Sequence, residues 1–161
     1  MPLPFHQIDA FSDRPFAGNP AVVYRLDHWL EDGLMQQIAA EHNLAETAFV
    51  VKEGAAWRIR WFTPTIEVPL CGHATLASAH ALFECHGEPG ERIDFNYVDG
   101  TLAVDREGDR LVLDLACNRH RLPRLRGWQT FSGKRRLPCW MRRSCSSCSS
   151  HRWLWLPASR I

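Results

Sequence analysis

The sequence predicts an α+β protein in which a mostly antiparallel sheet surrounds one buried helix. Short stretches rich in β-branched and aromatic residues recur between turn signals over residues 5–116, as in sheets built from hairpins. Residues 72–86 are apolar or small on nearly every side, so a helix there has no face suited to water. Residues 32–42 have apolar positions at helical spacing. Many short strands with only two helices indicate the α+β class.

The expected strands are short runs that contain several β-branched, aromatic or other apolar residues. They lie at residues 5–11, 21–26, 46–53, 57–62, 92–97, 101–107 and 110–116. Residues 13–20 are expected to form a loop because Gly, Asn and Pro favour turns. Residues 98–100 and 107–109 are expected to turn between the last three strands, and Asp-Gly in the first is a hairpin signal.

The two expected helices differ in how much of their surface is apolar. The first covers residues 32–42 and carries its apolar positions on one face: Leu34, Met35, Ile38 and Ala39. Asn43 is a suitable residue to end it. The second runs from Gly72 to about Cys85, and its apolar residues predict that strands enclose it.

Length and composition set limits on the class of protein. A chain of 161 residues with 45% hydrophobic residues is sufficient for one globular domain. It has no run of 18 apolar residues, and its first residues do not resemble a secretory signal. We therefore expect a cytoplasmic protein with reduced cysteines and no membrane partner.

Charge divides the chain into two parts. Residues 1–114 hold 8 Lys+Arg and 18 Asp+Glu, a net charge of 8 − 18 = −10, whereas residues 115–161 hold 11 Lys+Arg and no acid. The second part also holds four of the seven tryptophans and four of the six cysteines. We expect a domain at residues 1–116 and a basic, poorly ordered tail at residues 117–161 without a core of its own.

The tail suggests two binding functions, both with little support. Cys145 and Cys148 have the spacing of a metal-binding pair and His151 follows, but one pair is not a zinc framework. Basic residues beside tryptophans resemble a nucleic-acid patch, but no nucleic-acid-binding pattern accompanies them. We therefore expect neither a metal nor specific nucleic-acid binding.

Glu46 is the first candidate for chemistry. It stands where the helix ending near Asn43 gives way to an apolar strand, and partial burial there would raise its pKa toward the range of a general acid or base. The alternative is a solvated glutamate in a turn, which composition alone favours.

The start of the buried helix is the second candidate. Unpaired amides at a helix N-terminus bind carboxylate or phosphate, Gly72 would let a ligand approach the backbone, and His73 could orient it. An ordinary entry to a core helix is the alternative. Cys71 could be an activated thiol or a buried one. Asn19 could donate to a ligand or cap its turn.

Three stretches of the chain together resemble one known family. AFSDRPFAGNPAVV, MQQIAAEHNLAETAFV and RWFTPTIEVPLCGHATLASAHAL occur in the order found in phenazine-biosynthesis PhzF-like isomerases, over about residues 4–115. The resemblance implies half of a diaminopimelate epimerase-like fold. In that fold each of two similar domains wraps a sheet around a central helix, and the active site lies between the domains.

The same resemblance implies roles for individual residues. Glu46 resembles the acid/base that shuttles a proton, Gly72 and His73 the helix start that binds substrate, and Asn19 a residue lining the cleft. The reaction it implies is proton transfer on a small cyclic carboxylic acid, without metal or organic cofactor. Cys71 is then a neighbour rather than the base. A homodimer is left open.

The chain departs from the family pattern near Ala116. Family members are roughly twice as long as the matched region, so we expect the second half of the active site to be missing and activity to be lost or impaired. A frameshift in a GC-rich gene would explain the abrupt loss of acidic residues. Two further hypotheses are a non-catalytic remnant or small-molecule binding module, and a tail that binds nucleic acid.

Overall fold

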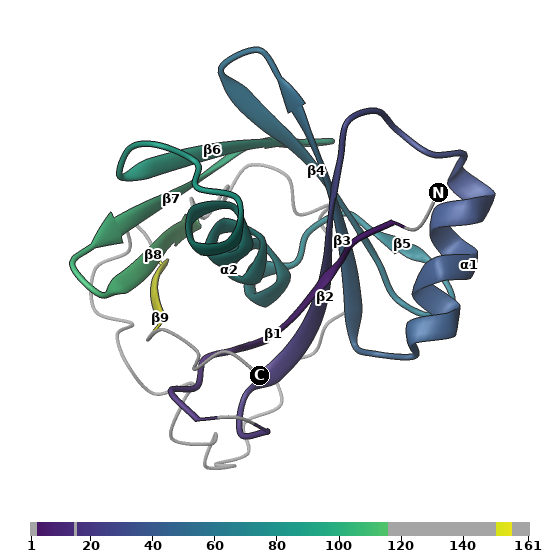
Figure 1. Ribbon diagram of the computed structural model, residues 1–161, viewed down its shortest axis with the longest axis horizontal. Helices are drawn as coiled ribbons and strands as arrows, with labels where there is room; N and C mark the ends of the chain where they lie inside the picture. Colours follow the sequence, from purple (N-terminus) through teal and green to yellow (C-terminus); the bar gives the residue numbers. More distant parts are fainter. Residues whose placement is uncertain (1–2, 15, 116–150, 156–161) are drawn as a thin grey trace, which may run out of the picture. The chain divides into compact units, whose positions relative to one another are not determined.

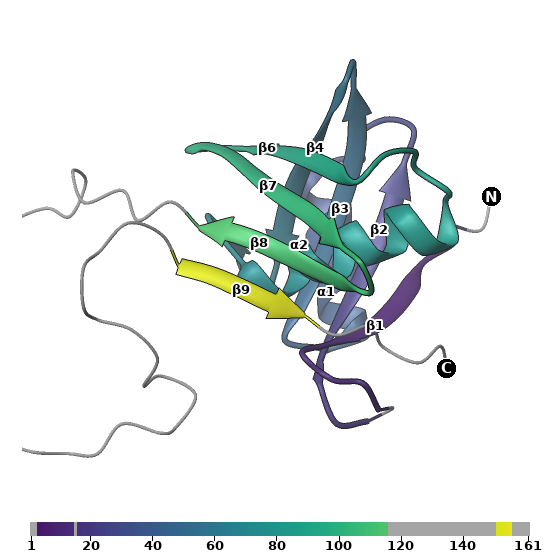
Figure 2. The same cartoon turned by 90° about the vertical axis from the view of Figure 1, so that its left-hand side faces the viewer.

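A computed structural model describes residues 3–14, 16–115 and 151–155, the last range by its backbone alone. The described residues form one nine-stranded sheet with the order β1-β2-β3-β4-β6-β7-β8-β9, and β5 also pairs with β4 (Figures 1 and 2). The strands are β1 (His6–Ala10), β2 (Asn19–Leu26), β3 (Glu46–Glu53), β4 (Ala56–Phe62), β5 (Glu67–Val68), β6 (Arg92–Tyr97), β7 (Gly100–Glu107), β8 (Arg110–Leu115) and β9 (His151–Trp155).

Seven of these strands were expected from the sequence, and none of their ends differs from the prediction by more than two residues. The α+β class is confirmed. β9 was not expected, because it lies in the segment that has no regular pattern. The remaining predictions for residues 117–161, including the CxxC pair, fall outside the described residues.

The sheet is mixed, with five antiparallel and two parallel pairs among those of defined register. The parallel pairs are β2–β3 and β4–β6. In each case a helix lies between the two strands in sequence, and a helical crossover returns the chain to the end of the sheet where it started. The residue pattern of a strand can indicate a hairpin, but it does not indicate that two strands joined through a helix pair in parallel.

Helix α1 (Asp32–His42) covers one face of the sheet, as its apolar spacing predicts. Met35 and Ala39 are its buried residues, and they pack in a cluster with side chains of β2, β3 and β4. Asn43 ends the helix in the left-handed conformation at φ 50°, and its backbone N–H donates to the Ala39 carbonyl. The predicted helix end is therefore confirmed.

Helix α2 (Gly72–His80) lies on the other face and continues into a π-helical turn, Ala81–Cys85. Every residue from Ala74 to Phe83 is buried. Figure 1 shows α2 nearly end-on, with β1–β3 on one side and β6–β8 on the other. Small side chains let the helix lie close to the strands, and the apolar side chains of both sheet halves meet it in one core cluster.

Two polar side chains in this enclosed helix have partners within it. The hydroxyl of Thr75 donates to the Cys71 carbonyl at 2.5 Å, and that of Ser78 donates to the Ala74 carbonyl at 2.7 Å. These bonds remove the cost of burying an unpaired hydroxyl. Within the described ranges, no helix is long and apolar enough to cross a membrane.

Leu76 tests the enclosure of α2, because its side chain is completely buried. We expect Leu76→Ala to lower the free energy of unfolding by about 2–5 kcal/mol, through lost apolar burial and the cavity left behind. Leu34→Ala on α1 is the matched control, since Leu34 is 44% exposed and should cost about 0.5 kcal/mol or less. Urea unfolding measures both. Equal losses would mean that α2 is not enclosed.

Candidate active site

Glu46 begins β3 and points toward α2. It pairs with Ala21 of the parallel strand β2. Side chains alternate along a strand, so Glu46 faces the same side as Ala48 and Val50, which belong to the core cluster around α2. The carboxylate therefore lies at the edge of this core rather than in a solvated turn, and its side chain is only 20% exposed.

The first turn of α2 brings the other candidates to the same place. Cys71 is the N-cap residue with an extended backbone, φ −144° and ψ 115°, and Gly72 and His73 are the first two helical residues. Cys71 is 8% exposed and the His73 side chain 10%. Since α2 is enclosed by strands, its start is held against the beginning of β3.

Three ionisable groups meet at this point. His73 Nε2 lies 3.1 Å from Glu46 Oε2, and Cys71 Sγ lies 3.3 Å from His73 Nδ1. One donor atom from each of the three residues lies within 4.8 Å of the others. Although Glu46 and His73 are in contact, Oε2 and Nε2 are not aligned as a hydrogen bond, and both are buried without a hydrogen-bond partner.

Burial favours the neutral form of each group. Desolvation raises the pKa of Glu46 above its ordinary value of 4.5. It lowers the pKa of His73, and a hydrogen bond with the backbone of Pro20 acts in the opposite direction. Burial also raises the pKa of the Cys71 thiol to about 12, against hydrogen bonds from the Ala74 and His73 backbone. Glu46 is thus shifted toward the range in which a carboxyl both accepts and donates protons.

Gly72 lies at the start of α2, and the structure shows what a side chain there would meet. A Cβ there would lie 3.8 Å from side-chain carbons of Leu113 and Leu115, an ordinary van der Waals distance on the side of β8. The backbone at Gly72 is therefore not crowded, and a methyl group would point toward β8.

Asn19 begins β2 and pairs with Ala10 of β1. It stands next to Pro20, whose backbone contacts His73, so β2 carries Asn19 toward the site. Its neighbour Gly18 must be glycine, because a Cβ there would lie 2.5 Å from the Ala10 carbonyl oxygen. Pro20 was missed by sequence reasoning, since a backbone carbonyl has no signature in the side-chain pattern.

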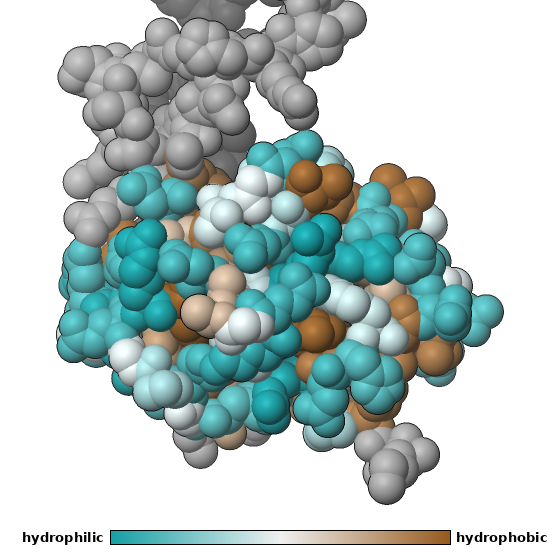
Figure 3. All heavy atoms as spheres, turned by 90° about the horizontal axis from the view of Figure 1, so that it is seen from above, coloured by the Kyte–Doolittle hydropathy of each residue, from teal (hydrophilic) through white to brown (hydrophobic). Residues whose placement is uncertain are grey.

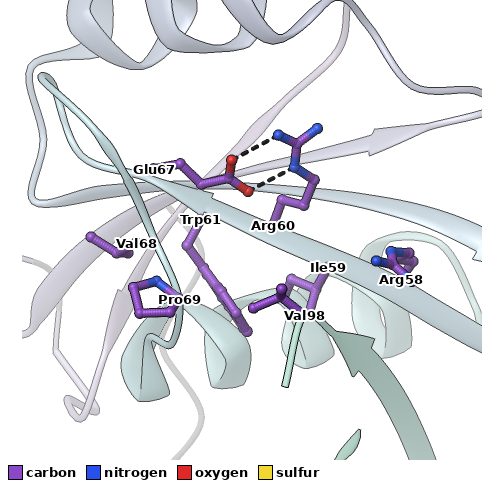
Figure 4. A pocket seen from close by; sticks show the side chains of 8 residues that line it. All are labelled: Arg58, Ile59, Arg60, Trp61, Glu67, Val68, Pro69 and Val98. Atoms are coloured by element: carbon purple, nitrogen blue, oxygen red, sulfur yellow. Dashed lines mark hydrogen bonds and ion pairs between the residues drawn. The ribbon is translucent and has the colours of Figure 1, made fainter. Parts of the chain in front are cut away.

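A separate groove lies over β4 and β5. Its cavity is about 430 Å³, and its lining residues come from β4, β5 and the segments after β5 and β6: Arg58, Ile59, Arg60, Trp61, Glu67, Val68, Pro69 and Val98 (Figure 4). Arg60 donates two hydrogen bonds to the Glu67 carboxylate at 2.7 Å. The face in Figure 3 carries its hydrophobic residues in separate patches among hydrophilic ones. None of the groove's lining residues belongs to the Glu46 cluster.

Comparison with known proteins assigns the family. A family profile described as "Phenazine biosynthesis-like protein" matches residues 8–125, most of the chain. The chain belongs to this family. The predicted resemblance is confirmed, and the match extends nine residues beyond Ala116, since 125 − 116 = 9. All four candidate positions and Cys71 fall inside it.

Relatives within the family are long compared with this chain. An uncharacterized isomerase of Pseudomonas aeruginosa is 72% identical over 114 residues, which cover 71% of this chain and 44% of that protein. A human phenazine biosynthesis-like domain-containing protein is 45% identical over 123 residues, covering 71% and 43%. A crystal structure of a PhzF family protein of Enterococcus faecalis has a TM-score of 0.71 at 47% identity, covering 72% and 45%. The chain thus spans less than half the length of these relatives.

Replacing the carboxyl of Glu46 by an amide tests its burial. Its raised pKa means that the protonated form favours folding. The stability that this protonated carboxyl contributes is fully present below about pH 4.5, the pKa in the unfolded chain, and is lost as the pH rises through the raised pKa of the folded state. We expect Glu46→Gln to have little effect on stability at pH 4 and to be increasingly more stable than the wild type above pH 4.5. Urea unfolding across this range measures it, with the exposed Glu31→Gln as control. A difference that does not grow with pH would contradict a buried carboxylate.

Two glycines at the site differ in what a methyl group would meet. Gly72→Ala should change the free energy of unfolding by about 1 kcal/mol or less, because its Cβ has room beside Leu113 and Leu115. Gly18→Ala should cost about 1–3 kcal/mol, because the backbone of β1 must move. Thermal or urea unfolding measures the change in both variants, and a larger loss for Gly72→Ala than for Gly18→Ala would contradict the close approach of Gly18 to β1.

Proposed function

We propose that this domain supplies the acid/base half of an isomerase active site. The reaction is an intramolecular proton transfer on a small cyclic carboxylic acid, without metal or organic cofactor. Glu46 is the acid/base, Gly72 and His73 form the helix start that binds the substrate, and Asn19 lines the cleft. The observation that carries the proposal is the 3.1 Å contact between the buried Glu46 carboxylate and His73 at the start of α2.

The proposed chemistry follows from the state of each group. A carboxylate with a raised pKa removes a proton from carbon, holds it, and returns it at another position of the same substrate. The first turn of α2 attracts a substrate carboxylate because it lies at the positive end of the helix dipole, although the backbone of His73 and Ala74 also hydrogen-bonds the Cys71 thiol. The lowered pKa of His73 favours its neutral form. The name "isomerase" of the Pseudomonas aeruginosa relative supports this class of reaction.

We further propose that the sheet and α2 form one half of a diaminopimelate epimerase-like fold. A solved structure of a predicted epimerase from Pseudomonas aeruginosa supports this, with a TM-score of 0.62 at 27% identity over 43% of that chain. In such a protein the substrate lies between two domains. The 161-residue chain by itself is therefore inactive or impaired, because a substrate held from one side is not positioned against Glu46.

A non-catalytic small-molecule binding module is the second candidate, since a helix start beside a histidine suits carboxylate binding without proton transfer. The partner in both cases is a small-molecule carboxylate. We also propose a cytoplasmic location, in keeping with Cys71 and Cys85, which form no disulfide, and a homodimer is a further proposal.

Proton exchange tests the proposed reaction. The probe is a dihydro-hydroxyanthranilate in deuterated water, and the measurement is deuterium uptake at carbon by NMR. Three proteins are compared: this chain, the full-length Pseudomonas aeruginosa relative, and a fusion of this domain to the rest of that relative. We expect exchange in the relative and the fusion, and at least about a hundredfold less in this chain.

Glu46→Gln in the fusion should abolish exchange, whereas Glu53→Gln at the other end of β3 should leave it unchanged. Robust exchange by the 161-residue chain would show that one domain is sufficient. Exchange that survives Glu46→Gln in the fusion would remove Glu46 as the acid/base. Carboxylate binding without exchange in any of the three would favour the binding module.

A further inference from the structure

Glu46, Cys71 and His73 combine three kinds of metal-binding group at one point. A thiolate, an imidazole and a carboxylate are the three side chains that bind zinc in proteins. We propose that these three residues form a binding site for zinc or a similar divalent ion, which competes with the acid/base function of the same groups. The inhibition of proton transfer by the ion rests on the proposed function, whereas binding of the ion does not.

The distances between the groups are close to those that zinc requires. With bonds of about 2.3 Å to sulfur and about 2.0–2.1 Å to nitrogen or oxygen, tetrahedral ligands lie roughly 3.3–3.6 Å apart. The thiol and His73 are 3.3 Å apart, and His73 and Glu46 are 3.1 Å apart. These two contacts use different ring nitrogens. When one His73 nitrogen is taken together with one ligand atom from each of the other two residues, no two of the three atoms are more than 4.8 Å apart. To bind one zinc ion, the most distant pair would therefore have to approach by at most about 1.5 Å, from 4.8 to 3.3 Å.

The unpaired atoms of the cluster point to a ligand. Glu46 Oε2 and His73 Nε2 are both buried and have no hydrogen-bond partner. Buried polar atoms ordinarily have a hydrogen-bond partner, whereas these two have only their 3.1 Å contact with each other. An ion bound between Oε2 and Nε2 would use both lone pairs. The His73 side chain is nine-tenths buried, so water supplies little compensation.

The groups are also held in place before an ion arrives. Cys71 and His73 belong to the first turn of α2, which is fixed by the bond from the Thr75 hydroxyl to the Cys71 carbonyl and by the enclosed helix behind it. The backbone of Pro20 hydrogen-bonds the His73 ring. Metal-binding histidines ordinarily carry such a second partner, which fixes the orientation of the ring.

Charge and access are compatible with a divalent ion. On binding, the thiol of Cys71 releases its proton to water and a sulfur–zinc bond forms. Thiolate, carboxylate and Zn²⁺ then sum to zero charge. Glu46 is the most exposed of the three groups, with 20% of its side chain accessible, so water can reach a fourth position on its side. With Glu46 and His73 bound to the ion, neither can move a proton, and zinc is a reversible inhibitor of the proposed reaction.

Metal titration of the full chain under reducing conditions tests the site. Because the sequence after residue 116 contains further thiols, the background carries Cys117→Ser, Cys139→Ser, Cys145→Ser and Cys148→Ser. Cobalt(II) is the spectroscopic probe and zinc, measured by competition with a chromophoric chelator, is the affinity probe. We expect one equivalent of cobalt to give a thiolate-to-cobalt charge-transfer band.

In this background Cys71→Ser should abolish the band, and Glu46→Gln and His73→Gln should each weaken zinc binding at least about tenfold. The matched control is Cys85→Ser, at the exposed end of the π-helical turn, which should keep both band and affinity. Circular dichroism establishes that each variant is folded. The proposal is overturned if the background binds no zinc at millimolar concentration, or if zinc affinity in folded Cys71→Ser and Glu46→Gln equals that of the background. Neither the cobalt spectrum nor the zinc competition uses a substrate, so the metal-site proposal can fail without affecting the proposed isomerase function, and the reverse.

Discussion

The enclosure of α2 is the constraint on which the rest of the structure depends. A helix that is buried from Ala74 to Phe83 needs apolar contacts along its length, and side chains of β1–β4 and β6–β8 share one core cluster with it. The enclosed helix also gives its N-terminus one fixed position. That position is the start of β3, where Glu46 meets Cys71 and His73. Fold and site thus result from the same packing.

The site depends on a balance between burial and charge. Enclosure desolvates a carboxyl, an imidazole and a thiol together, and each pKa moves toward the neutral form. Burying the Glu46 carboxylate without a hydrogen-bond partner lowers the stability of the folded protein. Proteins tolerate such a cost mainly at functional sites. The two proposals, proton transfer and metal binding, both rest on these buried groups of Glu46 and His73.

Much of the fold could be predicted from local patterns. Runs of β-branched residues, turn residues and the left-handed Asn43 depend on the chain within a few residues, so strands, α1 and its end were accessible. Parallel pairing of β2 with β3 depends on the crossover through α1, and the extra strand β9 has no local pattern. The residue types at the site were identified because ETAF and CGHAT are distinctive. Their distances, the role of the Pro20 backbone and the direction of Gly72 depend on tertiary packing, which no pattern in the sequence encodes.

The π-helical turn at Ala81–Cys85 has a consequence for how this helix can change in evolution. Its hydrogen bonds span five residues, as from the His86 N–H to the Ala81 carbonyl, so the turn accommodates one more residue than an α-helical turn. An insertion earlier in α2 would rotate the preceding or following buried side chains by about 100°. An inserted residue is therefore accommodated with least disturbance at the C-terminal end, far from Cys71 and His73, so the connection to β6 can change in length while the start of α2 keeps its register.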